Sequence, residues 1–299
     1  MPHRVSVITP SYNQGRFIER TIQSVLAQQF PGNLEYLVMD GGSNDGTLAI
    51  LKRYDSSVHA VSEKDRGQAD AVNKGLARAT GDIIGWLNSD DIYYPGALAA
   101  ACEALDSHPD VDVVYGDANH IDEHGGIIEP YPTEPWNSDR LLEACYLCQP
   151  AVFFRKRVVD RFGPLNEELN FCLDYEYWIR LAAAGAKFLR VRQVLAGSRL
   201  HAETKTRGFR IRFHTEINDM LCRYAARVPD SWLFSYAHAV LDEKGFPRSD
   251  KLRFPLLVSA LSLRAALRWN RAISRQMTKT TGAWAMNAIR NFCRRKIVK

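Results

Sequence analysis

Hydrophobic and polar positions alternate along the first 90 residues with two periods, one typical of strands and one typical of helices. Short β-branched runs at Val5–Ile8 and Leu34–Met39 predict buried strands. Between these runs, residues 16–28 carry apolar side chains at helical spacing. The alternation continues with predicted helices at 47–54 and 69–79 and predicted strands at 58–61 and 82–87. This β-α-β order predicts a mainly parallel sheet with helices on both faces.

The later part of the chain repeats strand and helix signals at wider spacing. Strands are expected at 111–115, 149–155 and 188–195, and a helix is expected to begin at Leu173. Beyond these elements the pattern becomes helical up to the last residue. The sequence therefore predicts an α/β catalytic domain at 1–206, followed by a C-terminal helical extension at 207–299.

Polar residues follow each predicted strand of the first 90 residues, and ligands of parallel sheets bind beyond the carboxyl ends of the strands. The four segments are 9–13 (TPSYN), 40–47 (DGGSNDGT), 63–67 (EKDRG) and 88–91 (NSDD). Helix capping alone is one explanation for Ser43, Asp45 and Asp65. The last segment is harder to explain in that way, because adjacent carboxylates repel one another and a bound cation is the common reason to gather them.

Two nucleotide-binding motifs are missing from the sequence. No G-x-G-x-x-G follows the first strand, and no G-x-x-x-x-G-K-[ST] occurs anywhere in the chain. A dinucleotide-dependent dehydrogenase and a P-loop NTPase are therefore disfavoured. The remaining interpretation is an α/β nucleotide site whose phosphates are handled by a divalent metal held on carboxylates.

The ordered motifs resemble glycosyltransferase family 2 with the GT-A fold. The resemblance rests on 7–13 (VITPSYN), 40–47, 62–67 (SEKDRG) leading to Asn73-Lys74-Gly75, and 86–91 (WLNSDD), and it covers roughly residues 4–205. It implies a Rossmann-like mixed, mainly parallel sheet, a nucleotide-sugar donor, a divalent metal and inversion at the anomeric carbon. UDP-, GDP- and dTDP-sugars cannot be separated on the sequence.

The resemblance also implies roles for individual residues in donor binding. Residues of the first, second and third loops would line the nucleotide, and the amide of the fourth loop would bind ribose: Pro10, Tyr12, Asn13, Asp40, Asp65, Arg66, Asn88 and Ser89. The D-x-D motif of the family begins here with Asn88, an amide that brings no charge. The expected ligands of Mn²⁺ or Mg²⁺ are therefore Asp90, with help from Asp91 or His201.

By the same resemblance, Asp174 falls where the family places its general base, at the start of a helix. Such a carboxylate would accept the proton of the attacking hydroxyl. The structural alternative is that Asp174 caps its helix while Glu176 pairs with Arg180 at i,i+4. Acceptor or supporting roles are assigned to Glu176, Trp178 and Arg199, although Trp178 fits a core position better.

Charge is distributed unevenly in this chain of 299 residues with net charge +5. Residues 251–299 hold 12 of the 39 basic residues and no acidic residue, which leaves 27 basic against 34 acidic residues in positions 1–250. The tail offers two basic helical patterns, one with Arg264, Arg268, Arg271 and Arg275 on a single stripe and one with Trp284, Ala285, Ala288, Ile289 and Phe292 on one face. Such helices suit an anionic membrane surface. The alternative is that they pack on the acidic body or form a homodimer.

Membrane spans and targeting signals are not expected. The longest apolar stretch, Pro255–Leu263, is far shorter than the roughly 20 residues that span a bilayer, and residues 1–10 lack the pattern of a secretory signal. We expect a cytoplasmic protein, peripheral on the inner face of the cytoplasmic membrane if the tail binds lipid. Nucleic acid is not an expected partner, because no recognised binding motif accompanies the basic charge.

The sequence as a whole predicts a metal-dependent, inverting glycosyltransferase of bacterial surface polysaccharide or glycolipid synthesis. Its acceptor would be the hydroxyl of a saccharide or a lipid-linked saccharide. A nucleotidyltransferase with a similar site remains an alternative, for which Asp174 would be dispensable. A catalytically silent nucleotide-sugar-binding scaffold is a second alternative, which Asn88 and Leu173 keep open because acidic residues are frequent at these positions in the family.

Overall fold

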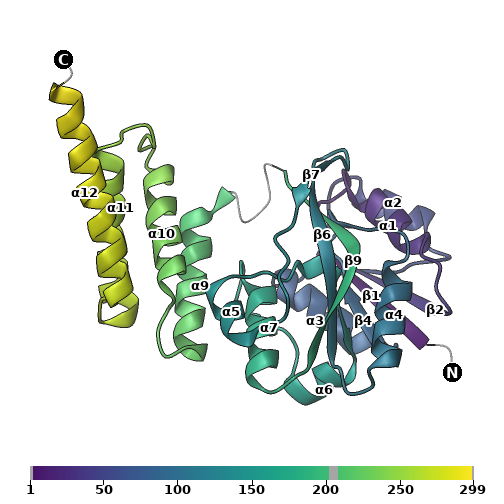
Figure 1. Ribbon diagram of the computed structural model, residues 1–299. Helices are drawn as coiled ribbons and strands as arrows, with labels where there is room; N and C mark the ends of the chain where they lie inside the picture. Colours follow the sequence, from purple (N-terminus) through teal and green to yellow (C-terminus); the bar gives the residue numbers. More distant parts are fainter. Residues whose placement is uncertain (1–2, 202–207, 298–299) are drawn as a thin grey trace. The chain divides into compact units, whose positions relative to one another are not determined.

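Nine strands form one mixed sheet in the computed structural model, which describes residues 3–201 and 208–297 (Figure 1). The strands are β1 (His3–Ser11), β2 (Gly32–Asp40), β3 (His59–Ser62), β4 (Ile83–Trp86), β5 (Ile92–Tyr93), β6 (Val113–Ile121), β7 (Ile127–Pro130), β8 (Val152–Arg155) and β9 (Phe188–Arg199). Their order in the sheet is β3-β2-β1-β4-β8-β6-β9-β5, with β7 paired to β6. The predicted mixed α/β sheet is confirmed.

Parallel pairing is concentrated in the first half of the sheet. Strands β3, β2, β1 and β4 are all parallel neighbours, and β6 pairs with β9 in parallel. Strand β8 is antiparallel to both β4 and β6, while β5 and β7 add antiparallel pairs at β9 and β6. Because Ser11 pairs with Asp40 and Asp40 pairs with Ser62, the loops after the first three strands leave the sheet at the same edge.

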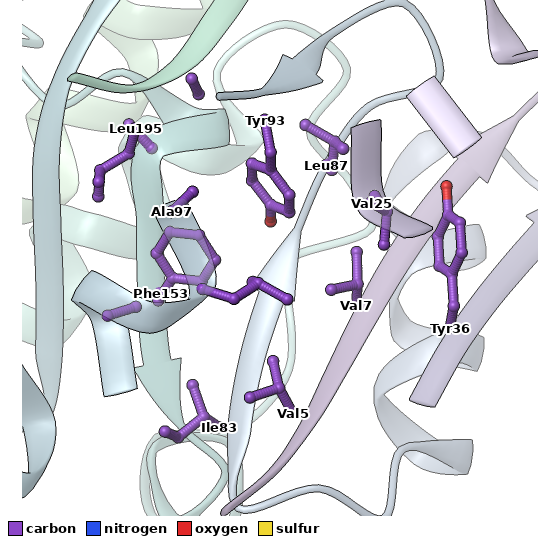
Figure 2. Packing of buried hydrophobic residues seen from close by; sticks show 14 of the residues in the cluster. Val5, Val7, Val25, Tyr36, Ile83, Leu87, Tyr93, Ala97, Phe153 and Leu195 are labelled. Carbon is purple, nitrogen blue, oxygen red and sulfur yellow. The ribbon is translucent and has the colours of Figure 1, made fainter. Parts of the chain in front are cut away.

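Helices cover both faces of the sheet, as the alternation of elements predicts. The helices of this part are α1 (Ile18–Leu26), α2 (Thr47–Arg53), α3 (Gln68–Arg78), α4 (Ala97–Ser107), α6 (Arg157–Phe162) and α7 (Leu173–Ala183), together with the 3₁₀ turn η1 (Gln149–Ala151). Helices α1, α2 and α4 pack on the face that carries Val5, Val7 and Phe153 (Figure 2). Helices α3 and α7 lie on the opposite face, where Gly75 contacts Ile8 and Trp178 contacts Phe154.

Close packing of α3 depends on a glycine. A Cβ atom on Gly75 would lie 2.4 Å from Cγ2 of Ile8, a distance that no side chain tolerates inside a packed core. Helix α3 therefore approaches β1 closely. The approach holds the β3–α3 loop, which contains Asp65 and Arg66, near the carboxyl edge of the sheet.

The described residues divide into two compact units. The sheet unit lies within Met1–Ser138 and Cys145–His201, and the helical unit lies within Asp139–Ala144 and Ala202–Lys299. The predicted domain boundary between residues 206 and 207 falls outside the described residues. The helical unit consists of most of α5 (Ser138–Glu143), α9 (Arg210–Tyr224), α10 (Asp230–Glu243), α11 (Arg253–Asn270) and α12 (Arg275–Ile297).

The helical unit has a small core of its own. Buried side chains from α10 and α11 meet there, with Trp284 of α12 packed against them: Ala237, Leu241, Phe254 and Val258. Three further side chains of α12 are buried: Met277, Thr281 and Ala288. Along the described residues no helix is both long enough and apolar enough to cross a bilayer.

The arginine stripe expected in the tail does not exist as one helix face. Helix α11 ends at Asn270, and Arg271 adopts a left-handed conformation with φ of 54° before α12 begins at Arg275. Only Arg264 and Arg268 share a face of α11, because the left-handed residue breaks the helical path. The second predicted face is also divided, since Ala288 is buried whereas Ile289 is 51% exposed.

Candidate functional site

The loops after β1 and β2 are tied together at the carboxyl edge of the sheet. Asn13 adopts a left-handed conformation with φ of 52°, which asparagine tolerates better than most residues. Its N–H donates to Oγ of Ser43 at 2.8 Å, and its Oδ1 accepts from the N–H of Asn44 at 2.9 Å. Tyr12, beside it, is 58% exposed, whereas Pro10 is buried. The loop therefore presents an aromatic ring to solvent from a fixed backbone.

Asp40 organises the loop after β2. Its buried carboxylate accepts from the N–H groups of Gly42 and Ser43 at 3.1 and 2.9 Å. It also accepts from the hydroxyls of Ser43 at 2.5 Å and Ser62 at 2.6 Å. These contacts fasten the β2 loop to the end of β3, so that Asp40 shapes the surface beyond the strands.

The loop after β3 lies directly against the loop after β2. A Cβ atom on Gly41 would lie 2.4 Å from Oδ2 of Asp65, so a larger residue would require the Asp65 carboxylate to move. Asp65 also accepts from the N–H of Gly67 at 2.9 Å. Arg66 is exposed and donates to Oε2 of Glu167 at 2.5 Å, which links this loop to the segment before α7.

Asn88, the residue that replaces the first acid of the D-x-D pattern, is held by three hydrogen bonds. Its Oδ1 accepts from Nε2 of Gln68 at 2.8 Å and from Nε1 of Trp86 at 3.0 Å. Its Nδ2 donates to Oε1 of Gln149 at 2.8 Å, while Nε2 of Gln149 donates to the carbonyl of Trp86 at 2.5 Å. A carboxylate could not donate to Gln149, so the amide is the side chain that satisfies this network.

Asp90 and His201 form the pair that fits a divalent metal. Oδ2 of Asp90 lies 3.0 Å from Nε2 of His201, whose side chain is 4% exposed and whose ring packs on Phe17 at 4.9 Å between centroids. Two adjacent ligands of an octahedral ion, each about 2.1 Å from it, are also about 3.0 Å apart. Carboxylate and imidazole are both suitable ligands for such ions.

The number of protein ligands fits an ion that is shared with a substrate. Within residues 3–201 and 208–297, no three or more histidine, cysteine or acidic side chains gather so that they could hold a metal by themselves. Mg²⁺ in nucleotide sites usually takes one or two carboxylates and completes its shell with phosphate oxygens and water. A two-ligand site is therefore appropriate for a cation that arrives with a diphosphate.

Asp91 lies in a different environment from its neighbour. It is buried, and its Oδ1 accepts from the backbone N–H of Arg199 at 2.7 Å. Burial and the charge of Asp90 raise the pKa of the Asp91 carboxyl well above its usual range, although the N–H and the charge of Arg199 oppose the shift. Of the three ligands expected from the sequence, the structure brings Asp90 and His201 together and directs Asp91 to the backbone of β9.

Asp174 is half-buried in the first turn of α7. Burial raises the pKa of the Cys145 thiol, and the negative charge of Asp174 raises it further. Burial likewise raises the pKa of Cys148, on which both Asp91 and Asp174 act. The carboxylates of the fourth loop and of α7 are therefore within electrostatic range of the same thiol.

The acceptor roles expected for Glu176, Trp178 and Arg199 are not supported by their positions. Glu176 is 3% exposed and accepts from Nε of Arg180 at 2.9 Å, the i,i+4 pair that was the structural alternative. Trp178 is fully buried against Phe154, and Arg199 is 2% exposed. Side chains without accessible surface cannot touch an incoming acceptor, so these three support the fold around the site.

Sequence reasoning missed one support of the fourth loop. Oγ1 of Thr21 in α1 lies 2.9 Å from the carbonyl of Ser89 and 2.7 Å from that of Asp91. Ser89 itself is buried, so its place in the site is defined by its backbone. A buried threonine within the apolar face of α1 was the only available signal, and it does not identify a partner 68 positions away.

Comparisons with known proteins find relatives among the glycosyltransferases. A profile of glycosyl transferase family 2 matches residues 6–161, which is a little over half of the 299 residues. An uncharacterized glycosyltransferase of Mycobacterium tuberculosis is 33% identical over 181 residues, 60% of this chain and 68% of the relative. Chondroitin synthase of Escherichia coli is 28% identical over 202 residues, 67% of this chain but 29% of the relative.

Other relatives are also longer than the matched region. An uncharacterized glycosyltransferase of Rickettsia conorii is 29% identical over 214 residues, and the match spans 67% of this chain and 34% of the relative. The chain therefore corresponds to about a third of that protein.

Solved structures share the fold at low identity. The crystal structure of S. aureus TarS residues 1–349 with UDP-GlcNAc has a TM-score of 0.65 and 18% identity, covering 95% of this chain and 89% of the other. Mannosyltransferase PcManGT from Pyrobaculum calidifontis, in complex with GDP-Man and Mn²⁺, has a TM-score of 0.61 and 21% identity, covering 97% and 81%. At these identities the likeness establishes the GT-A fold.

Proposed function

The chain belongs to glycosyl transferase family 2, and from this premise we propose that it transfers a sugar from a nucleotide-sugar donor to a hydroxyl acceptor with inversion. The observation that carries the proposal is the Asp90–His201 pair at the carboxyl edge of the sheet, in which Oδ2 of Asp90 lies 3.0 Å from Nε2 of His201. Asp174, in the first turn of α7, is proposed to act together with this pair. UDP-GlcNAc in TarS and GDP-Man in PcManGT support a donor of this class.

We assign the nucleotide to the surface formed by the first three strand loops. The exposed ring of Tyr12 offers a face on which a base can stack. Asp65 and Arg66 lie on the adjoining loop, which Gly41 allows to approach closely. Asp40 and Asn13 hold these loops in place through the contacts described above. The donor would thus meet a preformed surface rather than order it on binding.

Asp90 and His201 would hold Mn²⁺ or Mg²⁺ together with the diphosphate of the donor. When bound, such an ion offsets the negative charge that grows on the departing nucleoside diphosphate. Asn88 and Asp91 contribute by shaping the loop, through contacts to Gln149 and to the backbone of Arg199. Mn²⁺ in the PcManGT crystal supports a metal of this kind.

Asp174 is proposed as the general base. Its carboxylate takes the proton of the acceptor hydroxyl while that oxygen attacks the anomeric carbon from the face opposite the diphosphate. The new carbon–oxygen bond forms as the bond to the diphosphate breaks, and the nucleoside diphosphate leaves with the bonding electrons. The half-buried position of Asp174 keeps it open to an acceptor, in contrast to buried Glu176.

A donor screen tests the proposed function. We expect one of UDP-, GDP- or dTDP-sugars to raise the melting temperature of the wild-type chain with Mn²⁺ or Mg²⁺, and slow release of nucleoside diphosphate and free sugar to follow. At a ligand concentration 100 times Kd, binding stabilises the folded state by about 2.7 kcal/mol. Release of sugar 1-phosphate, with transfer of the nucleoside monophosphate, would instead indicate a nucleotidyltransferase, and tight binding without any turnover would indicate a scaffold.

The helical unit suggests a peripheral position on a membrane. Helices α11 and α12 and the turn between them expose apolar side chains among basic ones: Leu267, Ile273, Met286 and Ile289 beside Arg264, Arg268, Lys279 and Arg290. Met286 is 68% exposed, which is unusual for so apolar a side chain beside exposed arginine. Basic and apolar groups together suit an anionic lipid interface, and hence a lipid-linked saccharide acceptor of surface polysaccharide or glycolipid synthesis.

Sedimentation with vesicles tests the membrane proposal. We expect the full chain to bind phosphatidylglycerol vesicles and to be released by salt, because Lys and Arg near the headgroups each contribute about 1 kcal/mol. Met286→Ser with Ile289→Ser should weaken binding, whereas Ala283→Ser, an exposed change on the same helix, should not. Binding that is absent, or equal on neutral phosphatidylcholine vesicles, would contradict the proposal.

A further inference from the structure

We propose that Arg199 is a positioning residue that sets the separation of Asp90 and His201 and thereby the affinity of the site for its divalent ion. The inference rests on the proposed function, since it concerns the pair assigned to the metal. Arg199 was expected from the sequence to act at the acceptor or as a support, yet its guanidinium is buried and turned away from solvent.

The side chain of Arg199 joins two loops that are far apart in the sequence. Its Nε donates to the carbonyl oxygen of Asp90 at 2.6 Å. Its Nη1 donates to the carbonyl oxygens of Asp122 and Glu123 at 2.7 and 3.0 Å, in the turn between β6 and β7. A planar guanidinium presents several N–H groups in fixed directions, so one side chain can hold both loops at once.

The backbone of Arg199 adds a second connection to the same loop. Its N–H donates to Oδ1 of Asp91 at 2.7 Å, so that the peptide and the side chain grip adjacent residues of the fourth loop. His201 follows two residues later. Arg199 is thus hydrogen-bonded to Asp90 and Asp91 through its side chain and its backbone. Because His201 is only two residues away, these bonds also limit how far its imidazole can lie from the Asp90 carboxylate.

Phe17 fixes the direction of both basic side chains. The guanidinium carbon of Arg199 lies 5.2 Å from the centre of the Phe17 ring, and the imidazole of His201 lies 4.9 Å from the same centre. The Phe17 ring thus contacts both the Arg199 guanidinium and the imidazole of His201, the proposed metal ligand. If Arg199 were replaced, His201 would keep its contact with Phe17, but the loop that carries Asp90 would lose the hydrogen bond that holds it in place.

The cost of burying this cation argues that it has a definite task. Burial lowers the pKa of the Arg199 guanidinium, and the charges of Asp91 and Asp90 oppose that shift. A buried charge destabilises the fold unless it is paired and hydrogen-bonded, and here the hydrogen bonds donated by the guanidinium lead to the fourth loop and to the β6–β7 turn. Arg199 would therefore orient the metal ligands without contacting the ion itself. Substitutions of such supporting residues commonly weaken metal affinity about 10- to 100-fold.

The test measures Mn²⁺ binding in folded variants. Arg199→Lys keeps the charge but loses the planar fork, and Arg199→Met keeps the length but loses both. We expect the Kd for Mn²⁺ to rise about tenfold or more in both variants. The Kd is measured from the electron spin resonance signal of free Mn²⁺, with and without the nucleoside diphosphate of the donor found in the screen. Nucleotide binding without metal should change little, since the hydrogen bonds of the Arg199 guanidinium to described residues lead to the backbone of Asp90, Asp122 and Glu123, and not to the residues assigned to the nucleotide.

Arg155 provides the matched control. It also donates to backbone carbonyls, those of Val111 at 2.8 Å and Leu105 at 2.6 Å, but it pairs with Ile83 at the start of β4, opposite the site. Arg155→Lys should leave the Kd for Mn²⁺ unchanged. Should Arg199→Met fail to fold, Arg199→Lys and Phe17→Leu carry the test.

The outcomes separate the two proposals. A weakened Kd in Arg199→Lys with an unchanged Kd in Arg155→Lys supports the positioning role. An unchanged Kd in Arg199→Lys, or an equal loss in Arg155→Lys, overturns the positioning role and leaves the proposed function standing. A wild-type chain that binds no Mn²⁺, alone or with any nucleoside diphosphate, overturns the metal assignment and this inference together.

Discussion

Replacing Asp174 by Asn is expected to abolish sugar transfer while leaving donor binding close to the wild-type level. The amide keeps the shape of the side chain but cannot accept a proton from the acceptor hydroxyl. General base catalysis contributes about 10²- to 10⁴-fold, so kcat should fall within that range. Product formation with a saccharide acceptor gives the rate, and thermal shift with donor and metal gives the binding.

Asp160→Asn is the control for this prediction. Asp160 is an exposed acid on α6 in the same unit, so its amide variant should transfer sugar at the wild-type rate. Wild-type turnover by Asp174→Asn would refute its role as base. If sugar 1-phosphate were released from the donor in that case, the nucleotidyltransferase interpretation would take the place of the present one.

Asp90→Ala is expected to remove the metal-dependent part of donor binding. The variant keeps His201 but loses the carboxylate that lies 3.0 Å from its Nε2. The stabilisation of wild type by donor with Mn²⁺, about 2.7 kcal/mol at 100 times Kd, should fall to the level seen without metal. Sugar transfer should fall at least about 10²-fold, because charge on the leaving diphosphate is no longer offset.

Asp82→Asn serves as the control for the metal prediction. Asp82 is exposed beside the start of β4, whereas Asp90 follows its carboxyl end, so the two acids lie at opposite edges of the sheet. The control should bind donor and Mn²⁺ as wild type does. Asp91→Ala adds a contrast, since loss of the hydrogen bond that Asp91 accepts from the N–H of Arg199 should lower folding stability more than it changes the choice of metal.

Much of the sheet was predictable from local pattern. The strands expected at 5–8, 34–39, 58–61 and 82–87 correspond to β1 to β4, because short β-branched runs with polar ends are read over a few residues. Helix α4 and the short strands β5 and β7 were not predicted. Helix α4 is rich in alanine and lacks a clear polar face, and β5 exists only through its pairing with β9.

The candidate site was predictable as a set of loops but less so as a set of side chains. Adjacent acids Asp90 and Asp91 look equivalent in the sequence, yet one faces His201 and the other faces the backbone of Arg199. His201, the partner of Asp90, lies 111 positions further along the chain, two residues beyond the end of β9. No local pattern specifies such a contact, because it depends on how β9 pairs within the sheet.

The sequence by itself determined the order of strands and helices in the first 90 residues, the polar loops at four strand ends and the separation of an acidic body from a basic tail. These features follow from residue period and composition, which are local. Tertiary structure alone decided that Arg199, Glu176 and Trp178 are buried, that Asp90 pairs with His201, and that the tail bends at Arg271. Burial and pairing depend on which distant segments meet, and that is fixed only when the sheet and its helices pack together.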